Sequence, residues 1–327
     1  MKAIVFDNYG PPEVLYVEEV PTPVPQPNEI LIRVRAAEAT KSDCEMRKSK
    51  GPIKWVWPYL RIATGILRPS RGRILGWYFA GEVESVGAKV THFKPGDRVF
   101  GCTKLRFGAY GEYVTLPESY TVALMPEDMS FEDAAAVPLG GLNALHFLRR
   151  AKIKPHESIL VIGAGGSIGM FTVMIAKSLG AKITVVDKAE KLPMLFKIGA
   201  DEAIDYQRED YWAIDKRFDV VFSTVAHSVY DKALSVLNPG GRYIVANPRL
   251  ADLVRSIFTS SFTDKRSIVA LALEKQEELE TLKSMLELGT IQSIVGHVFP
   301  MREAAKAHHL VESEGRRGAV VLQMYPP

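Results

Sequence analysis

The chain of 327 residues contains only two cysteines, Cys44 and Cys102. This number is too small for a disulfide framework, and without a Cys-x-x-Cys pair the sequence also lacks the usual structural zinc motif. We therefore expect both cysteines to be reduced thiols with no shared function.

The sequence also lacks a long apolar run and a large charge of one sign. No run approaches the roughly 20 apolar residues that a membrane-spanning helix needs. The opening MKAIVFDNYG has no secretory leader pattern and instead predicts a strand from Ala3 to Phe6. The net charge is only +3, so a nucleic-acid partner is not expected. These absences predict a cytoplasmic protein without a membrane anchor.

What is present predicts two domains, because the chain is too long for one ordinary core. Residues 1–122 consist of short β-like runs separated by proline and glycine, and residues 293–327 predict a β-α-β tail that we assign to the same domain. Residues 123–292 alternate strand and helix patterns, which is typical of a parallel sheet covered on both faces. The predicted fold class is α/β, a β-rich domain interrupted by a doubly wound parallel-sheet domain.

Ser130, followed by Asp133, predicts the start of a helix in the middle segment. The apolar runs that predict its parallel strands lie at 158–162, 182–186, 219–222, 242–246 and 267–271.

The segment 46–74 combines many Lys and Arg residues with Trp55, Trp57 and Tyr59. One interpretation is a basic, aromatic element that binds a membrane surface. The other is a helical flap over a substrate cleft, with its cations in water. The second is favoured because the apolar residues do not form one long stripe.

The strand at 158–162 is followed by a glycine-rich turn and then by an amphipathic helix. In such a turn the glycines let the backbone approach a pyrophosphate, while the free N–H groups and the dipole of the helix bind the anion. A glycine pattern alone is weak, but here a second strand ends at Asp187, about 20 residues on, as the dinucleotide-binding fingerprint requires. The predicted turn residues are Gly163, Ala164, Gly165, Gly166, Ser167, Ile168 and Gly169.

Asp187 is expected to accept hydrogen bonds from the adenosine ribose, which favours NAD and repels the 2′-phosphate of NADP. A second interpretation uses Lys188, Lys191 and Tyr206, whose cations offset Asp187 and bind that phosphate. A third treats Lys191 and Tyr206 as ordinary surface residues. The sequence therefore predicts NAD or NADP without deciding between them.

Several blocks of sequence, in the same order as in a known family, carry a wider resemblance. They lie at 1–15, 93–101, 134–138, 163–169, 180–182, 198–201 and 238–242. Over essentially its whole length the chain resembles a medium-chain dehydrogenase/reductase of the quinone oxidoreductase branch. The resemblance implies a split GroES-like catalytic domain with an inserted Rossmann domain, an active site in the cleft between them, and a homodimer formed across the Rossmann sheets.

The same resemblance assigns roles to several residues. It implies that Gly163, Gly166 and Gly169 contact the pyrophosphate. In NADP-using relatives, a lysine and a tyrosine matching Lys191 and Tyr206 hold the 2′-phosphate, and those relatives usually lack an acid at the position of Asp187.

Zinc-dependent members of the family differ from this chain at each ligand position. They have a cysteine where this chain has Thr40, a His-Glu pair where it has Trp77 and Tyr78, and a third ligand near Leu139. These side chains are not zinc ligands. His308 and His309, adjacent on a predicted helix, are expected to be surface residues on different faces. The sequence therefore predicts no metal site.

Without a metal ion there is no Lewis acid to lower the pKa of an alcohol. Transfer of a hydride from NAD(P)H to a quinone, enone or enal needs less assistance, because the conjugated system spreads the charge. Thr40 is expected either to donate to the substrate oxygen or to bond locally at the strand end. Asp43 is expected to orient this loop, and Asn143 to contact the nicotinamide or its ribose.

Two other functions fit the sequence. One is a zinc-independent alcohol dehydrogenase running in the opposite direction. The other is a cofactor-binding protein with a regulatory, RNA-binding or structural role, although RNA binding would need a basic stripe that a net charge of +3 does not favour.

Overall fold

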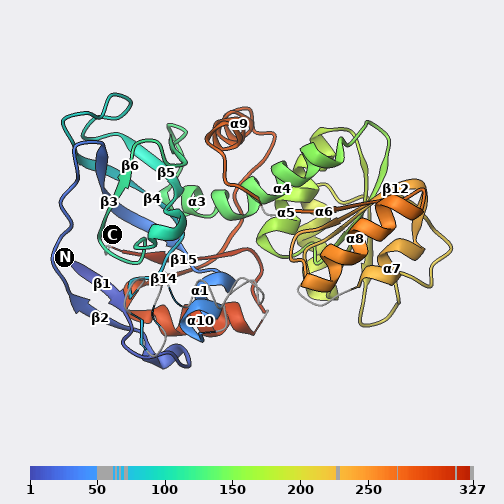
Figure 1. Cartoon of the computed structure of the whole chain (residues 1–327), viewed down its shortest axis with the longest axis horizontal. Helices are drawn as coiled ribbons and strands as arrows, with labels where there is room; N and C mark the ends of the chain where they lie inside the picture. The colour runs from blue at the N-terminus through green and yellow to red at the C-terminus, as the bar shows by residue number, and fades with distance from the viewer. Residues whose placement is uncertain are drawn as a thin grey trace. The chain divides into compact units, whose positions relative to one another are not determined.

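The computed structural model describes residues 1–49, 62, 65, 68, 69, 73–225, 229–270, 272–313 and 315–324. Most of the segment 46–74, where the flap is predicted, lies outside the described residues. The chain forms two compact units (Figure 1). Unit 1 comprises Met1–Pro138, Glu274–Glu287 and Gln292–Pro327, and unit 2 comprises Leu139–Leu273 and Leu288–Ile291. The domain boundaries expected at 122/123 and 292/293 stay a prediction.

Unit 1 is built around a mixed sheet of seven strands among the described residues. In spatial order they are β14 (Val295–Pro300), β15 (Ala319–Gln323), β3 (Glu29–Glu38), β4 (Tyr78–Val86), β5 (Arg98–Cys102) and β7 (Val122–Leu124), with β6 (Tyr113–Pro117) paired to β3. Of the strand pairs described in this sheet, β14–β15 is parallel and the others are antiparallel. The strands β1 (Lys2–Val5) and β2 (Tyr16–Glu19) form a separate antiparallel pair. Because β15 pairs with β3, the C-terminal tail belongs to the same sheet as the N-terminal strands.

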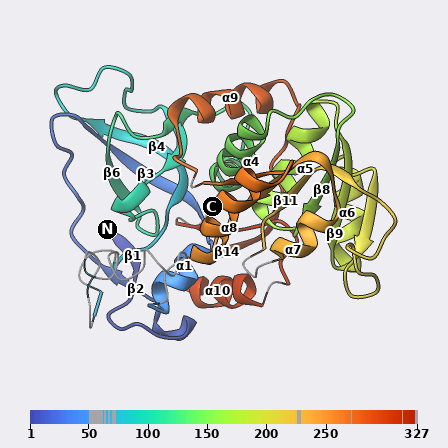
Figure 2. The same ribbon diagram turned by 45° about the vertical axis from the view of Figure 1, so that its right-hand side comes forward.

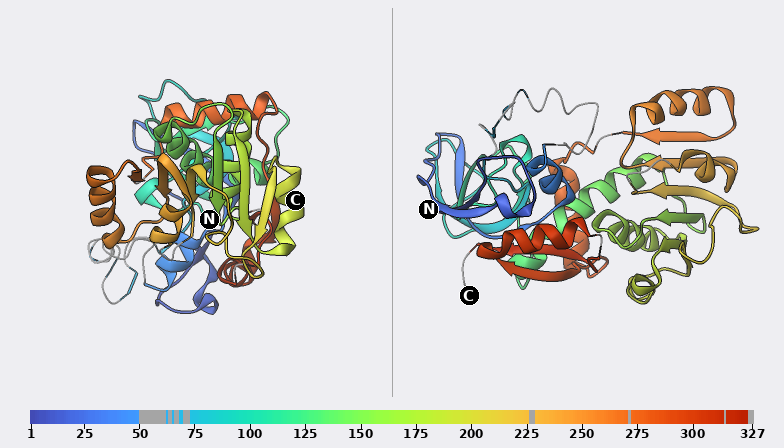
Figure 3. Two further views of the ribbon diagram at one scale, coloured as in Figure 1. Left: turned by 90° about the vertical axis from the view of Figure 1, so that its right-hand side faces the viewer. Right: turned by 90° about the horizontal axis from the view of Figure 1, so that it is seen from below.

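Short helices accompany this sheet, and α3 begins where the sequence predicts a helix start. Ser130 accepts a hydrogen bond from the Asp133 N–H at 3.1 Å, so the predicted helix start is confirmed. The right-hand panel of Figure 3 shows the last long helix, drawn in red, beside the strands of the C-terminal tail. The helices are η1 (Pro12–Val14), α1 (Lys41–Arg47), η2 (Lys104–Arg106), α3 (Phe131–Ala135), α9 (Gln276–Glu287), η4 (Met301–Glu303) and α10 (Ala304–Glu312), while α4 (Val137–Ala151) runs from unit 1 into unit 2.

The side chain at the start of α9 closes one edge of the sheet in unit 1. Gln276 Nε2 donates to the carbonyl oxygen of Val122 at 2.8 Å, and Gln276 Oε1 accepts from the Val122 N–H at 3.0 Å. One amide side chain therefore replaces a neighbouring strand at β7, which is the last strand of the sheet.

Unit 2 contains a six-stranded sheet that is parallel throughout (Figure 2). Its spatial order is β10 (Glu202–Asp205), β9 (Lys182–Asp187), β8 (Ser158–Ile162), β11 (Phe218–Ser223), β12 (Leu237–Val245) and β13 (Arg266–Val269). Numbered along the chain, this order is 3-2-1-4-5-6, the doubly wound order in which crossover helices cover both faces. The helices are α5 (Ser167–Ser178), η3 (Ala189–Lys191), α6 (Leu192–Lys197), α7 (Tyr230–Ser235) and α8 (Leu250–Phe262).

The predicted fold class is confirmed, and burial explains why the sequence revealed it. Central strands covered on both faces must be apolar throughout, and Ile159, Leu160 and Val161 of β8 are completely buried. The order of strands reverses between β8 and β11, and ligands of such sheets bind at the carboxyl ends of the strands beside that reversal. The turn after β8 is therefore the expected binding position. Within the described part of the chain, no helix combines the length and apolar character needed to cross a bilayer.

Candidate functional site

The glycine turn lies between the end of β8 and the start of α5. Gly163 has a φ of +79°, a backbone region that glycine occupies at little cost. Its N–H donates to the carbonyl oxygen of Val186 at 3.0 Å, so the turn is fixed to the end of the neighbouring strand β9. The turn is thus tied to the sheet and leads directly into the helix.

The other two glycines expected at the pyrophosphate have different environments. A Cβ atom at Gly169 would lie 2.6 Å from the backbone of Ala164 and Gly163, so this glycine permits close packing of α5 against the turn. A Cβ atom at Gly166 would meet only the Gly163 carbonyl oxygen, at 3.7 Å, and otherwise open space. Gly166 therefore leaves the room that an approaching phosphate needs.

The first turn of α5 supplies donors on this open side. Gly166 is the N-cap residue and contributes no side-chain hydrogen bond to the helix start. The helix itself offers no acceptor to the N–H groups of Ile168 and Gly169, and the positive end of its dipole lies here. The geometry at the start of α5 fits a bound anion, and the predicted contact of residues 163–169 with a pyrophosphate stays a prediction.

Asp187 lies at the end of β9, directly beside the turn. Its Oδ2 accepts a hydrogen bond from the Gly165 N–H at 2.7 Å, and its Oδ1 accepts one from the Lys188 N–H at 2.9 Å. The Lys191 ammonium lies 3.5 Å from Oδ1, and both side chains are buried. Each carboxylate oxygen can still accept a further hydrogen bond.

The structure brings the other residues predicted at the ribose to the same place. The Tyr206 N–H donates to the Asp187 carbonyl oxygen at 3.3 Å, while its side chain is 47% exposed. Lys191 is not an ordinary surface residue, because it is only 7% exposed and packs over Gly165. Lys188 is half-buried.

Asn143 lies on α4, one turn after Gly140. A Cβ atom at Gly140 would lie 2.6 Å from the Ser167 carbonyl oxygen, so this part of α4 packs against the start of α5. The side-chain Nδ2 of Asn143 donates to the Leu139 carbonyl oxygen at 2.9 Å. Its predicted contact with the nicotinamide or ribose stays a prediction.

Thr40 and Asp43 form a reciprocal cap at the start of α1. Thr40 Oγ1 donates to Asp43 Oδ2 at 2.6 Å and accepts from the Asp43 N–H at 3.1 Å. Asp43 also accepts from the N–H groups of Thr40 and Gly76, both at 3.0 Å. Burial raises the pKa of the Asp43 carboxyl to about 6, although these hydrogen bonds oppose the shift.

His308 corrects one expectation from the sequence. The two adjacent histidines do point to different faces of α10, but only His309 is on the surface, where it pairs with Glu13 at 2.5 Å. His308 is completely buried and hydrogen-bonds to Tyr110 Oη at 3.0 Å. Burial, with the charge of Arg47, lowers the pKa of His308 to about 3. The sequence around His308, with a second histidine next to it, does not indicate that His308 is buried.

Trp77 and Tyr78, which stand where zinc-dependent members of the resembled family have ligands, make other contacts in this structure. The Trp77 ring packs edge-to-face on Phe107, with ring centroids 4.7 Å apart. Tyr78 Oη donates to Glu274 Oε1 at 2.7 Å, and burial raises the pKa of both groups. Among the described residues, no group of three or more His, Cys, Asp or Glu side chains is arranged to hold a metal ion.

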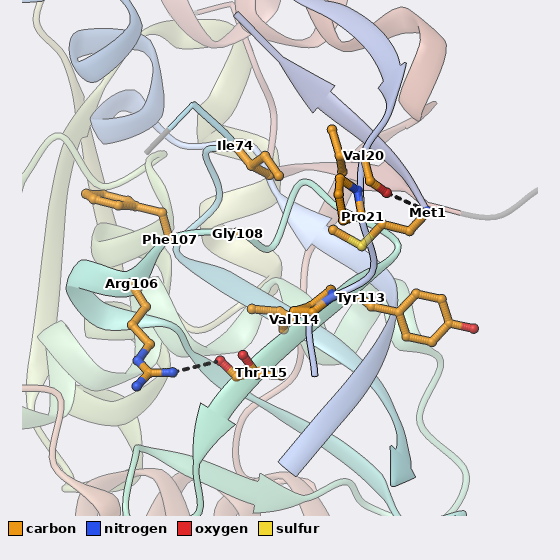
Figure 4. A pocket seen from close by; sticks show the side chains of 11 residues that line it. Met1, Val20, Pro21, Ile74, Arg106, Phe107, Gly108, Tyr113, Val114 and Thr115 are labelled. Carbon is orange, nitrogen blue, oxygen red and sulfur yellow. Dashed lines mark hydrogen bonds between the residues drawn. The ribbon is translucent and has the colours of Figure 1, made fainter. Parts of the chain in front are cut away.

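A pocket of about 330 Å³ lies in unit 1, and none of the residues predicted for the cofactor lines it (Figure 4). Apolar side chains such as Val20 and Ile74 form part of its wall, with Arg106 at one end. The Arg106 guanidinium forms an ion pair with Glu29 at 2.6 Å, so its charge is already compensated. We assign no function to this pocket.

Comparison with known proteins supports the same assignment as the geometry. A family model described as alcohol dehydrogenase GroES-like domain matches residues 26–127, and one described as zinc-binding dehydrogenase matches residues 198–322. The quinone oxidoreductase of Sus scrofa is 30% identical over 98% of this chain and 97% of its own length. The 2-methylene-furan-3-one reductase of Solanum lycopersicum is 30% identical over 100% of this chain and 80% of its own length.

A comparison with solved structures supports the same family. Escherichia coli quinone oxidoreductase complexed with NADPH has a TM-score of 0.82 and 28% identity, over 99% of this chain and 100% of that one. The two domain matches and full-length relatives define a two-domain dehydrogenase/reductase with a GroES-like and a Rossmann part. The chain belongs to the medium-chain dehydrogenase/reductase superfamily and, within it, to the quinone oxidoreductase-like branch.

Proposed function

We propose that the protein is an oxidoreductase that transfers a hydride from NADH or NADPH to a quinone, an enone or an enal without a catalytic zinc ion. The observation that carries this proposal is the turn at residues 163–169, where Gly166 leaves room for an anion and Asp187 is fixed beside the turn. The family membership and the NADPH complex of the E. coli relative support the same cofactor class.

When bound, the nicotinamide cofactor supplies the hydride. The residues of this chain bind and orient it. The N–H groups of Ile168 and Gly169, at the start of α5, would hold the pyrophosphate in the space that Gly166 leaves open. Asp187 would accept hydrogen bonds from the adenosine ribose, and Asn143 would contact the nicotinamide or its ribose. Thr40 and Asp43 position the substrate. A conjugated acceptor spreads the charge that the hydride brings, so positioning and hydrogen bonding account for most of the protein's task.

The zinc-free part of the proposal rests on the side chains at the family's ligand positions. The Thr40 hydroxyl donates a hydrogen bond to Asp43, the Trp77 ring packs on Phe107, and the Tyr78 hydroxyl donates to Glu274. A threonine hydroxyl, an indole and a phenol with a raised pKa are poor replacements for thiolate, imidazole and carboxylate ligands.

The preference between NAD and NADP depends on one buried pair. Lys191 lies 3.5 Å from Asp187, so the cation partly compensates the carboxylate that would repel a 2′-phosphate. Asp187 nevertheless keeps acceptor capacity on both oxygens for ribose hydroxyls. We propose that Asp187 favours NADH and that Lys191 moderates this preference.

We also propose a homodimer formed through unit 2. The strand β13 is at the edge of the six-stranded sheet, and α8 packs beside it. The outer side of α8 carries large apolar side chains in helical spacing, including Ile257 at 65%, Phe258 at 60% and Phe262 at 78% exposure. A second copy of the chain would cover this surface. The cytoplasmic location and the absence of a nucleic-acid partner stay predictions from the sequence.

The decisive experiment combines binding and turnover. NADH and NADPH are titrated by fluorescence, and their oxidation is followed with a panel of quinones, enones and enals before and after treatment with a chelator. Binding of a cofactor, with turnover that survives the chelator, supports the proposal. Failure to bind either cofactor, or activity that is lost with the chelator and restored by Zn²⁺, contradicts it. Alcohol oxidation measured in parallel tests the alternative function.

A further inference from the structure

A continuous line of hydrogen bonds crosses the interior of unit 1 between α10 and α1, two helices that lie side by side (Figures 1 and 2). Arg47 Nη1 is 3.4 Å from Nδ1 of His308. Nε2 of the same ring is 3.0 Å from Tyr110 Oη, and the Tyr110 hydroxyl bonds to the Asp43 carboxylate. All four side chains are completely buried.

The chemistry of the groups gives this line a direction. Arginine has only donors, so Nδ1 of His308 must accept the hydrogen bond from Arg47. The ring is neutral, since burial and the Arg47 charge hold the pKa of His308 at about 3. Nε2 therefore carries the proton and donates it to Tyr110 Oη. Because Tyr110 Oη accepts this hydrogen bond, its own O–H can donate a hydrogen bond to Asp43. All the hydrogen bonds in the line are therefore oriented towards the carboxylate.

The line ends at the cap that includes Thr40. Asp43 accepts from the Thr40 hydroxyl at 2.6 Å as well as from Tyr110. A threonine hydroxyl has one proton. As long as Asp43 is an anion, it therefore determines where the Thr40 proton points.

At the end of the line that is farthest from Asp43, acidic and basic side chains compensate one another. Arg47 forms an ion pair with Glu312, and Glu312 also binds Lys48 Nζ at 2.8 Å. Glu38 and Cys44 also act electrostatically on Tyr110. The hydrogen-bond donors that reach Asp43 itself are neutral: the hydroxyls of Thr40 and Tyr110 and the backbone N–H groups of Thr40 and Gly76.

We propose that Tyr110 and His308 are positioning residues of the reaction, which act through Asp43 to fix the Thr40 hydroxyl beside the substrate. This inference rests on the proposed function, which places Thr40 and Asp43 at the substrate. Removing the Tyr110 hydroxyl takes one donor from a buried carboxylate. The anionic form of Asp43 is then less stable, and its protonation moves to higher pH.

The kinetic test compares Tyr110→Phe with Tyr113→Phe, a tyrosine of β6 outside the line. Tyr110→Phe is expected to lower kcat about tenfold at pH 5 and about twofold at pH 7, because losing a hydrogen bond to a charged group raises the pKa of Asp43, which is about 6 in the wild type, by about one unit. It is also expected to move the acid limb of the pH profile of kcat up by about one unit, with an unchanged KM for the cofactor. Tyr113→Phe should match the wild type.

A Tyr110→Phe profile that is lowered by one factor at every pH, or that coincides with the Tyr113→Phe profile, would overturn the positioning role alone. A wild type that oxidises neither NADH nor NADPH with any acceptor would overturn the proposed function, and this role with it.

The direction of the line has its own test, which does not depend on activity. In ¹⁵N NMR of the wild type, the His308 signal, identified by its loss in His308→Gln, should show a proton on Nε2 and none on Nδ1 down to pH 5. A proton on Nδ1, or protonation of both nitrogens at pH 6, contradicts the proposal.

Two substitutions of His308 separate the hydrogen bonds from the ring itself. The amide introduced by His308→Gln can accept from Arg47 and donate to Tyr110, so this variant should retain the wild-type pH profile. The apolar side chain introduced by His308→Leu can do neither, so that variant should reproduce the shift of Tyr110→Phe. Equal profiles for the two variants would contradict a role that depends on the hydrogen bonds.

Discussion

A methyl group added at Gly166 would meet only the carbonyl oxygen of Gly163 at 3.7 Å, whereas one added at Gly169 would lie 2.6 Å from the Ala164 backbone. The two glycines belong to one turn but have different roles. Gly166 leaves open space beside the helix start, whereas Gly169 allows α5 to pack closely against the backbone of the turn. Neither has a positive φ, so substitution by alanine tests space and not backbone strain.

Gly166→Ala should therefore fold like the wild type and bind the cofactor at least about tenfold more weakly, since the methyl group occupies the space in front of the helix N-terminus. Gly169→Ala should instead lose about 1 to 3 kcal/mol of folding stability through overpacking. Thermal unfolding and NAD(P)H titration of both variants separate the effects. A Gly166→Ala variant with unchanged affinity would show that the pyrophosphate lies elsewhere.

Asp187→Asn should change which cofactor is preferred. The amide oxygen can still accept from the Gly165 N–H, but the negative charge that opposes a 2′-phosphate is gone and Lys191 becomes uncompensated. We expect the ratio of NADPH to NADH affinity to rise by at least about tenfold. Glu209→Gln, which removes an exposed acid of the same unit, serves as the control. Equal ratios in Asp187→Asn and the wild type would contradict the role of Asp187.

The buried His308 should make folding sensitive to acid. Its pKa is about 3 in the folded protein and about 6.5 in an unfolded chain, so only the unfolded state takes up this proton between those values. Stability therefore falls as the pH falls through this window. Between pH 7 and pH 5, wild type should lose about 2 kcal/mol more than His308→Gln.

Chemical denaturation at the two pH values measures the difference. His156→Gln is the control, because His156 is exposed in unit 2 and lies outside the buried line, so this variant should keep the pH dependence of the wild type. Parallel pH dependence of wild type and His308→Gln would mean that the histidine is already protonated in the folded protein.

Phe258→Glu should separate the two copies of the proposed dimer. A charge on the exposed apolar side of α8 would be buried without a partner in such an interface, at a cost of several kcal/mol. Sedimentation or light scattering should give a dimer for the wild type and a monomer for the variant. Val24→Glu adds a charge at a 78% exposed apolar residue of unit 1 and should remain dimeric. A monomeric wild type would rule out the interface.

The sequence predicted those parts of the molecule that depend on neighbouring residues. The glycine turn, the helix after it and the acid at the end of the next strand form a local pattern, because a phosphate site of this kind is built from one β-α-β segment. The strands β8, β9, β11, β12 and β13 of unit 2 were recognisable as apolar runs, since both faces of such a sheet are covered. The short edge strand β10 was missed, because Glu202 and Asp205 at its ends do not resemble a buried strand.

The buried line through His308 could not be predicted in the same way. Its partners Tyr110 and Arg47 are 198 and 261 residues away in the chain. No periodic pattern connects such positions, and a buried arginine becomes acceptable only when Glu312 is known to lie beside it. Thr40 and Asp43 were selected from the sequence as candidate residues, and the structure shows their mutual capping hydrogen bonds, while their role at the substrate stays a prediction.

The hydrogen bonds of Gln276 to Val122 make the protection of β7 depend on the order in which the chain is synthesised. An open strand edge is a template for pairing with other chains, and here its cover comes from a residue 154 positions further along. During synthesis, the strands from β3 to β7 are therefore made before Gln276 and before β14 and β15 of the same sheet. The edge at Val122 gains its cover only after the parallel-sheet segment between them has been synthesised.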